Sequence, residues 1–250
     1  MTVKIKFLFV FSLLIVLSCK KKKEQTPNVA TVETIRIEVS PKFGTSAFHL
    51  DSVYQTPEGY DVKFTDIIFY VTSLKNGNSV LSNAALFNLR STGNLLLETN
   101  ANHASFNQLQ GFLGVESTLN HADPSAFPTN SPLNIMNANT MHWGWNPGYI
   151  FFKIEAKLDT INDGNPLFDH QIAFHVGTDN AIQSLSSSNL TWNLTGGKYV
   201  NTWTLDMLTF LNDGVQSIDL KTENFTHSGT GSEVLTQKVS DLFKSAVQMN

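Results

Sequence analysis

The sequence predicts an all-β protein, an antiparallel β-sandwich with a long loop and a short C-terminal helix. Three observations predict it. Several segments alternate apolar and polar residues, the composition combines 41% hydrophobic with only 15% charged residues, and helical spacing occurs only near the end of the chain. The 250 residues contain no internal repeat and no interdomain linker. We therefore expect a single domain over residues 32–250.

The expected strands are recognised by alternating side chains or, in a central strand, by apolar residues on both faces. The clearest is 149–158, in which Lys153, Glu155 and Lys157 share one face and apolar residues take the other. A turn signal at 163–166 predicts that residues 172–176 return beside it as the second strand of a hairpin. The full set of expected strands is 35–39, 62–74, 86–89, 149–158, 172–176, 190–194 and 203–207.

Two further segments complete the expected fold. Residues 120–140 hold three prolines and many Asn and Ser residues, which indicates a long ordered loop. Loops of that length inside a compact domain usually carry function. Residues 234–246 place their apolar side chains at helical spacing, which predicts the C-terminal helix.

The N-terminus has the pattern of an export signal. Lys4 and Lys6 precede an apolar run over 7–17 that is too short for a stable membrane span. The run ends in Val-Leu-Ser-Cys at 16–19, which resembles a bacterial lipobox. We expect residues 1–18 to be a lipoprotein signal peptide, Cys19 to carry the lipid, and residues 19–31 to form a polar tether. The alternative is an ordinary signal peptide with an incidental Cys.

This interpretation fixes a compartment and a charge distribution. It predicts a bacterial cell-envelope protein, held on the periplasmic or surface face of the outer membrane by the lipid on Cys19. Six of the 17 basic residues precede Glu24, so 11 remain against 21 acidic residues, a net charge of −10. Such an acidic domain does not favour nucleic acid as a partner. With a single Cys, a metal site in the domain must use His, Met, carboxylate or backbone ligands.

The densest group of residues with chemical potential is Met-His-Trp-Gly-Trp-Asn-Pro-Gly-Tyr at 141–149. In an extended chain Met141, Trp143 and Trp145 share one face and His142 takes the other. A thioether beside two indoles is a plausible soft environment for copper. The alternative is an aromatic core cluster at the start of a strand.

Three further histidines are candidate ligands. His175 lies in the expected strand 172–176, His227 in a polar turn before the final helix, and His49 in the first strand region. Each could instead be a solvent-facing or hydrogen-bonded side chain. The sequence has no His-Glu-x-x-His motif, no Gly-x-Ser-x-Gly elbow and no phosphate-binding glycine loop, so we do not expect an enzyme. A hydrolase using Asp123 or Glu116 is the weakest alternative.

The run at 141–152 resembles the hallmark of the MbnP-like family, exported copper-binding proteins named for a member from methanobactin operons. Further segments resemble family segments in the same order, over roughly residues 32–245. They are Lys-Phe-Gly at 42–44, the Tyr-containing stretch at 64–74, Gly-Val-Glu-Ser-Thr at 114–118, and Phe-His-Val-Gly at 174–177.

The resemblance implies a β-sandwich that binds one copper ion through histidine. It also implies oxidation of a Trp to kynurenine by a dihaem partner of the cytochrome c peroxidase type. His175 and His227 match family histidines, and Trp143 and Trp145 match the tryptophan pair. Family members commonly carry a His where this chain has Pro41. The resemblance therefore implies either a site rebuilt with His49 or His142, or weakened or lost copper binding.

Two functions follow from these patterns. The first is a lipid-anchored, exported copper carrier or store, with His175 and His227 as ligands and Met141 or His49 as a third. The second is a metal-free β-sandwich binding module, in which Trp143 and Trp145 pack the core and the long loop contacts a partner protein or a glycan.

Overall fold

The computed structural model describes residues 2, 33–138, 140–144, 147–161, 163–165 and 167–250. The expected signal peptide, the tether and Cys19 lie outside the described residues, and so does Trp145. From residue 33 onward the described residues belong to one compact unit. None of the described helices is long and apolar enough to cross a membrane.

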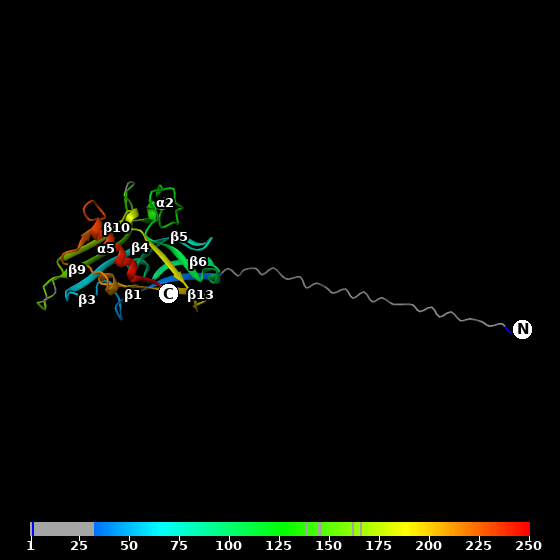
Figure 1. Cartoon of the computed structure of the whole chain (residues 1–250), viewed down its shortest axis with the longest axis horizontal. Helices are drawn as coiled ribbons and strands as arrows, with labels where there is room; N and C mark the ends of the chain where they lie inside the picture. Colours follow the sequence, from blue (N-terminus) through cyan, green and yellow to red (C-terminus); the bar gives the residue numbers. More distant parts are fainter. Residues whose placement is uncertain (1, 3–32, 139, 145–146, 162, 166) are drawn as a thin grey trace. The chain divides into compact units, whose positions relative to one another are not determined.

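The first sheet is built around the N-terminal strand of the domain (Figure 1). Its order is β12–β13–β1–β2, with β6 also paired to β1 and β15 to β13. Ile35, Ile37 and Val39 point inward from β1 and are almost completely buried. The strands are β1 (Glu33–Phe43), β2 (Ser46–Ala47), β6 (Leu95–Ala101), β12 (Asn193–Thr195), β13 (Lys198–Asp206) and β15 (Val247–Met249).

The second sheet is larger and has the order β11–β7–β4–β9–β10–β14. In addition, β3 and β5 both pair with β4, and β8 pairs with β9. The strands are β3 (Val53–Gln55), β4 (Asp61–Asn76), β5 (Ser79–Asn88), β7 (Gln108–Leu113), β8 (His142–Gly144), β9 (Gly148–Asp159), β10 (His170–Gly177), β11 (Gln183–Ser188) and β14 (Phe225–Thr226).

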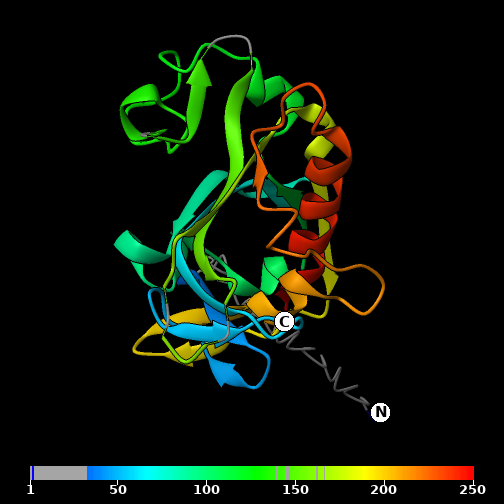
Figure 2. The same cartoon turned by 90° about the vertical axis from the view of Figure 1, so that its left-hand side faces the viewer.

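Helices are short except for the last one, which lies against the second sheet (Figure 2). Phe243 on α5 contacts three core rings, with centroid distances of 5.5 Å to Phe69, 4.4 Å to Phe152 and 6.0 Å to Phe210. The helices are α1 (Leu89–Thr92), η1 (His103–Phe106), α2 (Ser117–Asn120), α3 (Ile135–Ala138), η2 (Asp179–Ala181), α4 (Met207–Leu211) and α5 (Glu233–Ala246).

The sandwich and the C-terminal helix are confirmed, and β9 and β10 form the expected antiparallel pair. The pairing is not antiparallel throughout, because β1 pairs with β13 and β10 with β14 in parallel. Both parallel pairs join segments far apart in the sequence, where no turn signal reveals direction. The expected strand 190–194 is mostly irregular. Leu190 is buried, and the Trp192 indole donates a hydrogen bond to the carbonyl of Phe106 at 2.9 Å.

The long loop is ordered by hydrogen bonds to the outer face of the second sheet, the face turned away from α5. The hydroxyl of Tyr70 donates to the carbonyl of Pro132 at 3.1 Å, and that of Tyr149 donates to the carbonyl of Leu133. Burial raises the pKa of Tyr149 to about 12, so this hydroxyl keeps its proton. The loop is therefore fixed next to β8 and β9, which carry the aromatic motif.

Candidate metal centre

Two of the predicted histidines meet at an edge of the second sheet. β14 pairs in parallel with β10 so that Ala173 faces Phe225 and Phe174 faces Thr226. The next pair in this register is His175 and His227. Because side chains alternate between the faces of a strand, Phe225 and His227 share the face of His175. The two imidazole rings stack with centroids 4.4 Å apart and planes 9° apart.

His175 is held by a carboxylate on the neighbouring strand. Its Nε2 lies 2.9 Å from Oε1 of Glu155, and the side chain is 17% exposed. A carboxylate oxygen accepts, so Nε2 is the donor and Nδ1 keeps its lone pair. Burial lowers the pKa of His175; Glu155 opposes this effect and His227 adds to it. The ring is therefore neutral at neutral pH and has a nitrogen free to bind a cation.

Glu155 belongs to a row of charged side chains across β4 and β9. Nζ of Lys153 lies 2.7 Å from Oδ2 of Asp66 and 3.6 Å from Oε1 of Glu155. Lys153 also faces His175 in the register of β9 and β10. Glu155 was not among the predicted site residues. The signal was available, because the polar face of 149–158 and His175 belong to one predicted hairpin.

Trp143 covers the end of this pair. A Cβ atom added at Gly177 would lie 2.6 Å from Cζ3 of Trp143, so the indole rests directly on the glycine. The Trp143 ring centroid is 6.4 Å from that of His227. The backbone N–H of Gly177 donates to Oγ of Ser228 at 3.0 Å, which ties the His227 segment to the end of β10. The indole thus lies next to the imidazole pair.

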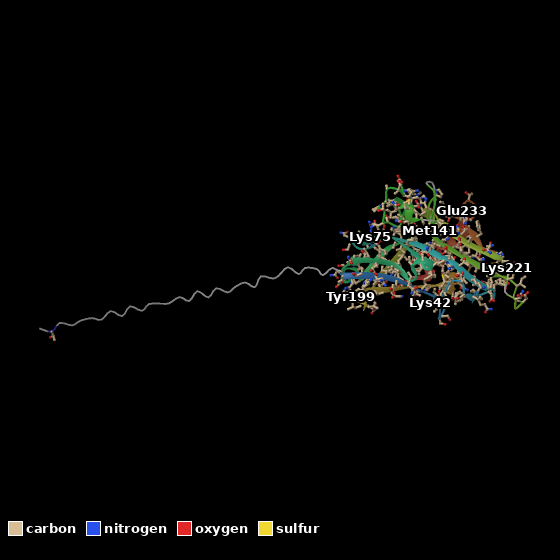
Figure 3. The ribbon with its side chains drawn as sticks, turned by 180° about the vertical axis from the view of Figure 1, so that it is seen from behind. Lys42, Lys75, Met141, Tyr199, Lys221 and Glu233 are labelled. Atoms are coloured by element: carbon tan, nitrogen blue, oxygen red, sulfur yellow. The ribbon has the colours of Figure 1, made fainter. Side chains whose placement is uncertain are left out.

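The other predicted ligands lie elsewhere. Met141 is 1% exposed and belongs to the hydrophobic core (Figure 3). The Nδ1 of His142 accepts a hydrogen bond from the N–H of Gly144 at 3.1 Å, and its ring meets the ring of Tyr149 edge-on. His49 is exposed, and no hydrogen bond or ring contact in the described part of the chain joins it to the pair. Its backbone N–H donates to the hydroxyl of Tyr54 at 2.6 Å.

Pro41, which stands at the usual histidine position of the resembled family, lies in β1 beside His49. The two residues line one surface hollow of about 460 Å³, together with Phe48 and Leu50. His49 is thus an imidazole beside the position at which the family commonly has a histidine. Nevertheless His49 lies in the loop after β2 of the first sheet, whereas His175 lies in β10 of the second sheet and His227 directly follows β14.

The donor set suits copper, but the present ring orientation does not close a site. Imidazole nitrogens are good copper ligands, and a carboxylate on the second ring nitrogen is a common support of a metal-bound histidine. The planes of two stacked rings run parallel, so their in-plane lone pairs do not converge on one point. Among the described residues no group of three or more His, Cys, Asp or Glu is placed to hold a metal ion. Binding through both rings therefore requires one of them to rotate.

Comparisons with known proteins bear on the whole domain. Among solved structures the chain is similar to MbnP from Methylosinus trichosporium, at 14% sequence identity and a TM-score of 0.49. The match covers 75% of this chain and 79% of that chain. No curated protein sequence matches. The MbnP family model matches residues 32–230, which is most of the chain. The ordered segments, the β-sandwich and this match agree, and the chain belongs to the MbnP family.

Proposed function

We propose that this protein is a lipid-anchored, exported copper-binding protein that carries or stores copper. The observation that supports this best is the pair of imidazoles, His175 and His227, stacked at 4.4 Å with Glu155 on one side and Trp143 near the other. Two imidazoles in an acidic domain are suitable ligands for a copper ion, and Asp66 and Glu155 lie close to the positive charge of Lys153 beside them.

The geometry favours a carrier over a catalyst. Two nitrogens, of which one must rotate to bind, give an exchangeable site, and among the described residues no third His, Cys, Asp or Glu is placed to close it. A site that must rearrange to bind releases its ion by the reverse motion. This exchange is what delivery to another site requires.

The aromatic cap supports a second part of the proposal. The Trp143 ring lies beside the imidazole pair, with its centroid 6.4 Å from that of His227. We propose Trp143 as the oxidised residue, with a dihaem protein of the cytochrome c peroxidase type as the partner. Trp145, the other candidate, lies outside the described residues.

One experiment tests copper and tryptophan oxidation together. Protein purified from its native host should carry about one copper ion per chain by metal analysis, and its peptide containing Trp143 should show a mass change. Copper-free protein that takes up no copper under reducing or oxidising conditions would falsify the copper proposal. An unmodified peptide would remove the oxidation from it and leave copper binding intact.

Removal of the Glu155 carboxylate is expected to weaken copper binding by about 10–100-fold, the usual effect of losing a support of a metal-bound histidine. Glu155→Gln should lose less than Glu155→Ala, because the amide oxygen still accepts from Nε2 of His175. Competition titration with a chelator measures both. Lys157→Ala, on the same face of β9, is the matched control. Equal affinities for all three variants would show that Glu155 does not orient His175.

The lipid anchor has a separate test. Cys19→Ser is expected to move the protein from the detergent-extracted membrane fraction to the soluble fraction, because no acyl chain can attach. Ser18→Ala keeps both the thiol and a small residue before it and should remain in the membrane fraction. Membrane retention of Cys19→Ser would contradict lipid anchoring.

A metal-free binding module is the second candidate, and one observation favours it. The two imidazoles stack on each other and Trp143 rests on Gly177, so these side chains have packing roles of their own. On this reading copper does not change the thermal stability of the protein. A rise in melting temperature with added copper, as ligand binding to the folded state produces, would exclude it.

A further inference from the structure

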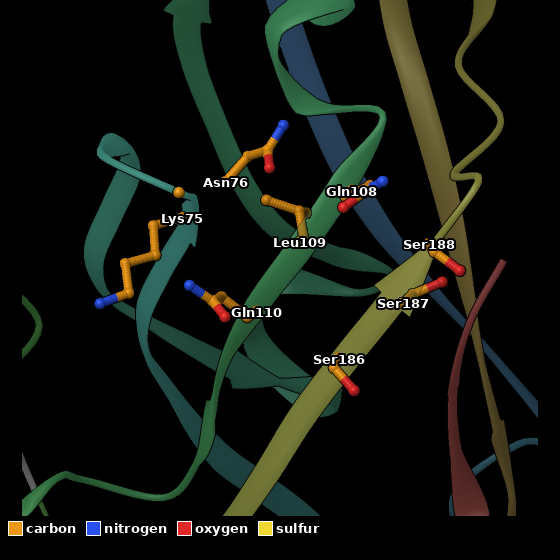
Figure 4. A pocket seen from close by; sticks show the side chains of 9 residues that line it. Lys75, Asn76, Gln108, Leu109, Gln110, Ser186, Ser187 and Ser188 are labelled. Atoms are coloured by element: carbon orange, nitrogen blue, oxygen red, sulfur yellow. The ribbon is translucent and has the colours of Figure 1, made fainter.

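A polar cleft lies at the opposite edge of the second sheet from His175 and His227. β11 forms one end of the strand order and β14 the other, so the two regions are separated by the width of the sheet. The cleft has a volume of about 470 Å³. It is lined by residues of the end of β4 and the turn after it, of β7 and of β11 (Figure 4): Lys75, Asn76, Gly77, Gln108, Leu109, Gln110, Ser186, Ser187 and Ser188.

The register places five long or hydroxyl-bearing side chains on one face of this cleft. Gln110 faces Ser186 and Gln108 faces Ser188 in the pairing of β7 with β11, and Lys75 faces Gln110 in the pairing of β4 with β7. All five are exposed. Leu109 and Ser187, which lie between them and also contribute to the lining, point to the other face of the sheet. Leu109 is buried, and Oγ of Ser187 donates to the carbonyl of Met249.

These five side chains are not used by the fold. Within the described ranges of the chain, no side-chain hydrogen bond or ion pair joins Lys75, Gln108, Gln110, Ser186 or Ser188 to another residue. Each of the two glutamines offers both an amide donor and a carbonyl acceptor. A preformed surface that carries several unused hydrogen-bonding groups on rigid strands is suited to a ligand that is itself rich in such groups.

The charge of the cleft narrows the ligand class. Lys75 is the one charged residue in its lining, and no carboxylate lines it, although the chain from Glu24 onward has a net charge of −10. A polyanion such as a nucleic acid needs several basic contacts, which this cleft does not offer. A ligand with many hydroxyl groups and isolated negative charges matches it.

An aromatic ring follows the cleft along β7, just outside its lining. Phe112 is the next residue along β7 that points to the side of Gln108 and Gln110, and it is half-buried. It faces Thr72 and Ser184 in the register. An aromatic ring beside amide and hydroxyl groups provides an apolar surface for the flat C–H face of a pyranose. We propose that this cleft binds an acidic oligosaccharide, with the glutamines and serines on its hydroxyl groups and Lys75 on a carboxylate.

The proposal is tested with trigalacturonic acid as probe and its fully methyl-esterified form as the uncharged counterpart. In the full chain labelled with ¹⁵N, the acid should shift the side-chain amide signals of Gln108 and Gln110. The ester should shift the same signals at higher concentration. Shifts confined to other residues, or none with either probe, would overturn the proposal. Shifts of the β11 backbone amides by an extended serine-rich peptide, without any by sugar, would instead identify a strand-binding edge.

Variants separate the roles of the residues. Gln110→Ala should weaken binding of the acid about tenfold, the effect of losing one or two hydrogen bonds. Lys75→Gln should abolish the preference for the acid over the ester. Gln248→Ala, an exposed glutamine of the first sheet, is the matched control and should bind as the unmodified protein does. Equal binding by Gln110→Ala and Gln248→Ala would contradict the assignment. Copper binding is independent of this result.

Discussion

Replacing His175 with alanine is expected to abolish copper binding, reducing the metal content from about one ion per chain to near zero. Glu155 accepts from Nε2 of His175 and so leaves its Nδ1 free to bind the ion. His175 is also the more enclosed member of the pair. Without it, His227 is a single imidazole directly after a short edge strand, and one nitrogen ligand does not hold copper against competing chelators. Metal analysis after dialysis against a weak chelator measures the loss.

Two other histidines make this test specific. His170 lies on the same strand as His175, and its ring is hydrogen-bonded to the side chain of Asn224. The variant His170→Ala should therefore keep its full copper content. His49→Ala removes the imidazole beside Pro41 and should also keep it. His227→Ala should behave as His175→Ala does. Loss of copper in His49→Ala with retention in His175→Ala would move the site to the first sheet.

The substitution Phe243→Ala is expected to lower the free energy of unfolding by about 3–5 kcal/mol, the usual cost of removing a large buried ring. Phe243 has no exposed surface and touches the rings of Phe69, Phe152 and Phe210. These rings come from β4, β9 and α4, so a single cavity loosens the helix and the sheet at once. Urea denaturation of the purified protein gives the value.

Val234 provides the control within the same helix. Its side chain is 86% exposed, so Val234→Ala should change the free energy of unfolding by less than about 0.5 kcal/mol. Both variants should keep the slope of the denaturation curve, since the folded core remains one unit. A loss below 1 kcal/mol for Phe243→Ala would show that α5 does not close the core as described.

Local patterns predicted the elements whose stability is decided locally. The alternation in 149–158 and the turn at 163–166 predicted the hairpin of β9 and β10, and helical spacing predicted α5. β6, β7 and β11 escaped prediction for different reasons. β6 has three consecutive leucines instead of an alternation, β7 is short and has a glycine at one of its buried positions, and β11 has one apolar residue, Leu185. The parallel pairing of β1 with β13 depends on contacts between distant segments, and no short window contains it.

The candidate site shows the same division. His175, His227 and Trp143 were each recognisable by residue type and resemblance. Their adjacency was not, because it arises from β14, a strand of two residues that no periodicity can reveal. Met141 was a candidate because it precedes His142 and Trp143, yet its side chain is buried in the core. A methionine packs well in a hydrophobic core, so residue type alone does not distinguish a metal ligand from a core residue.

The short length of β14 sets how metal exchange depends on protein stability. Only Phe225 and Thr226 pair with β10 and so hold His227 beside it. The Thr226 hydroxyl also lies 2.6 Å from the hydroxyl of Thr236, which attaches the segment to α5. An edge segment of this size opens at a small fraction of the global unfolding free energy. Copper release from the proposed site would thus follow the local opening rate, visible as fast amide hydrogen exchange at 225–228, and stay nearly constant in variants such as Phe243→Ala.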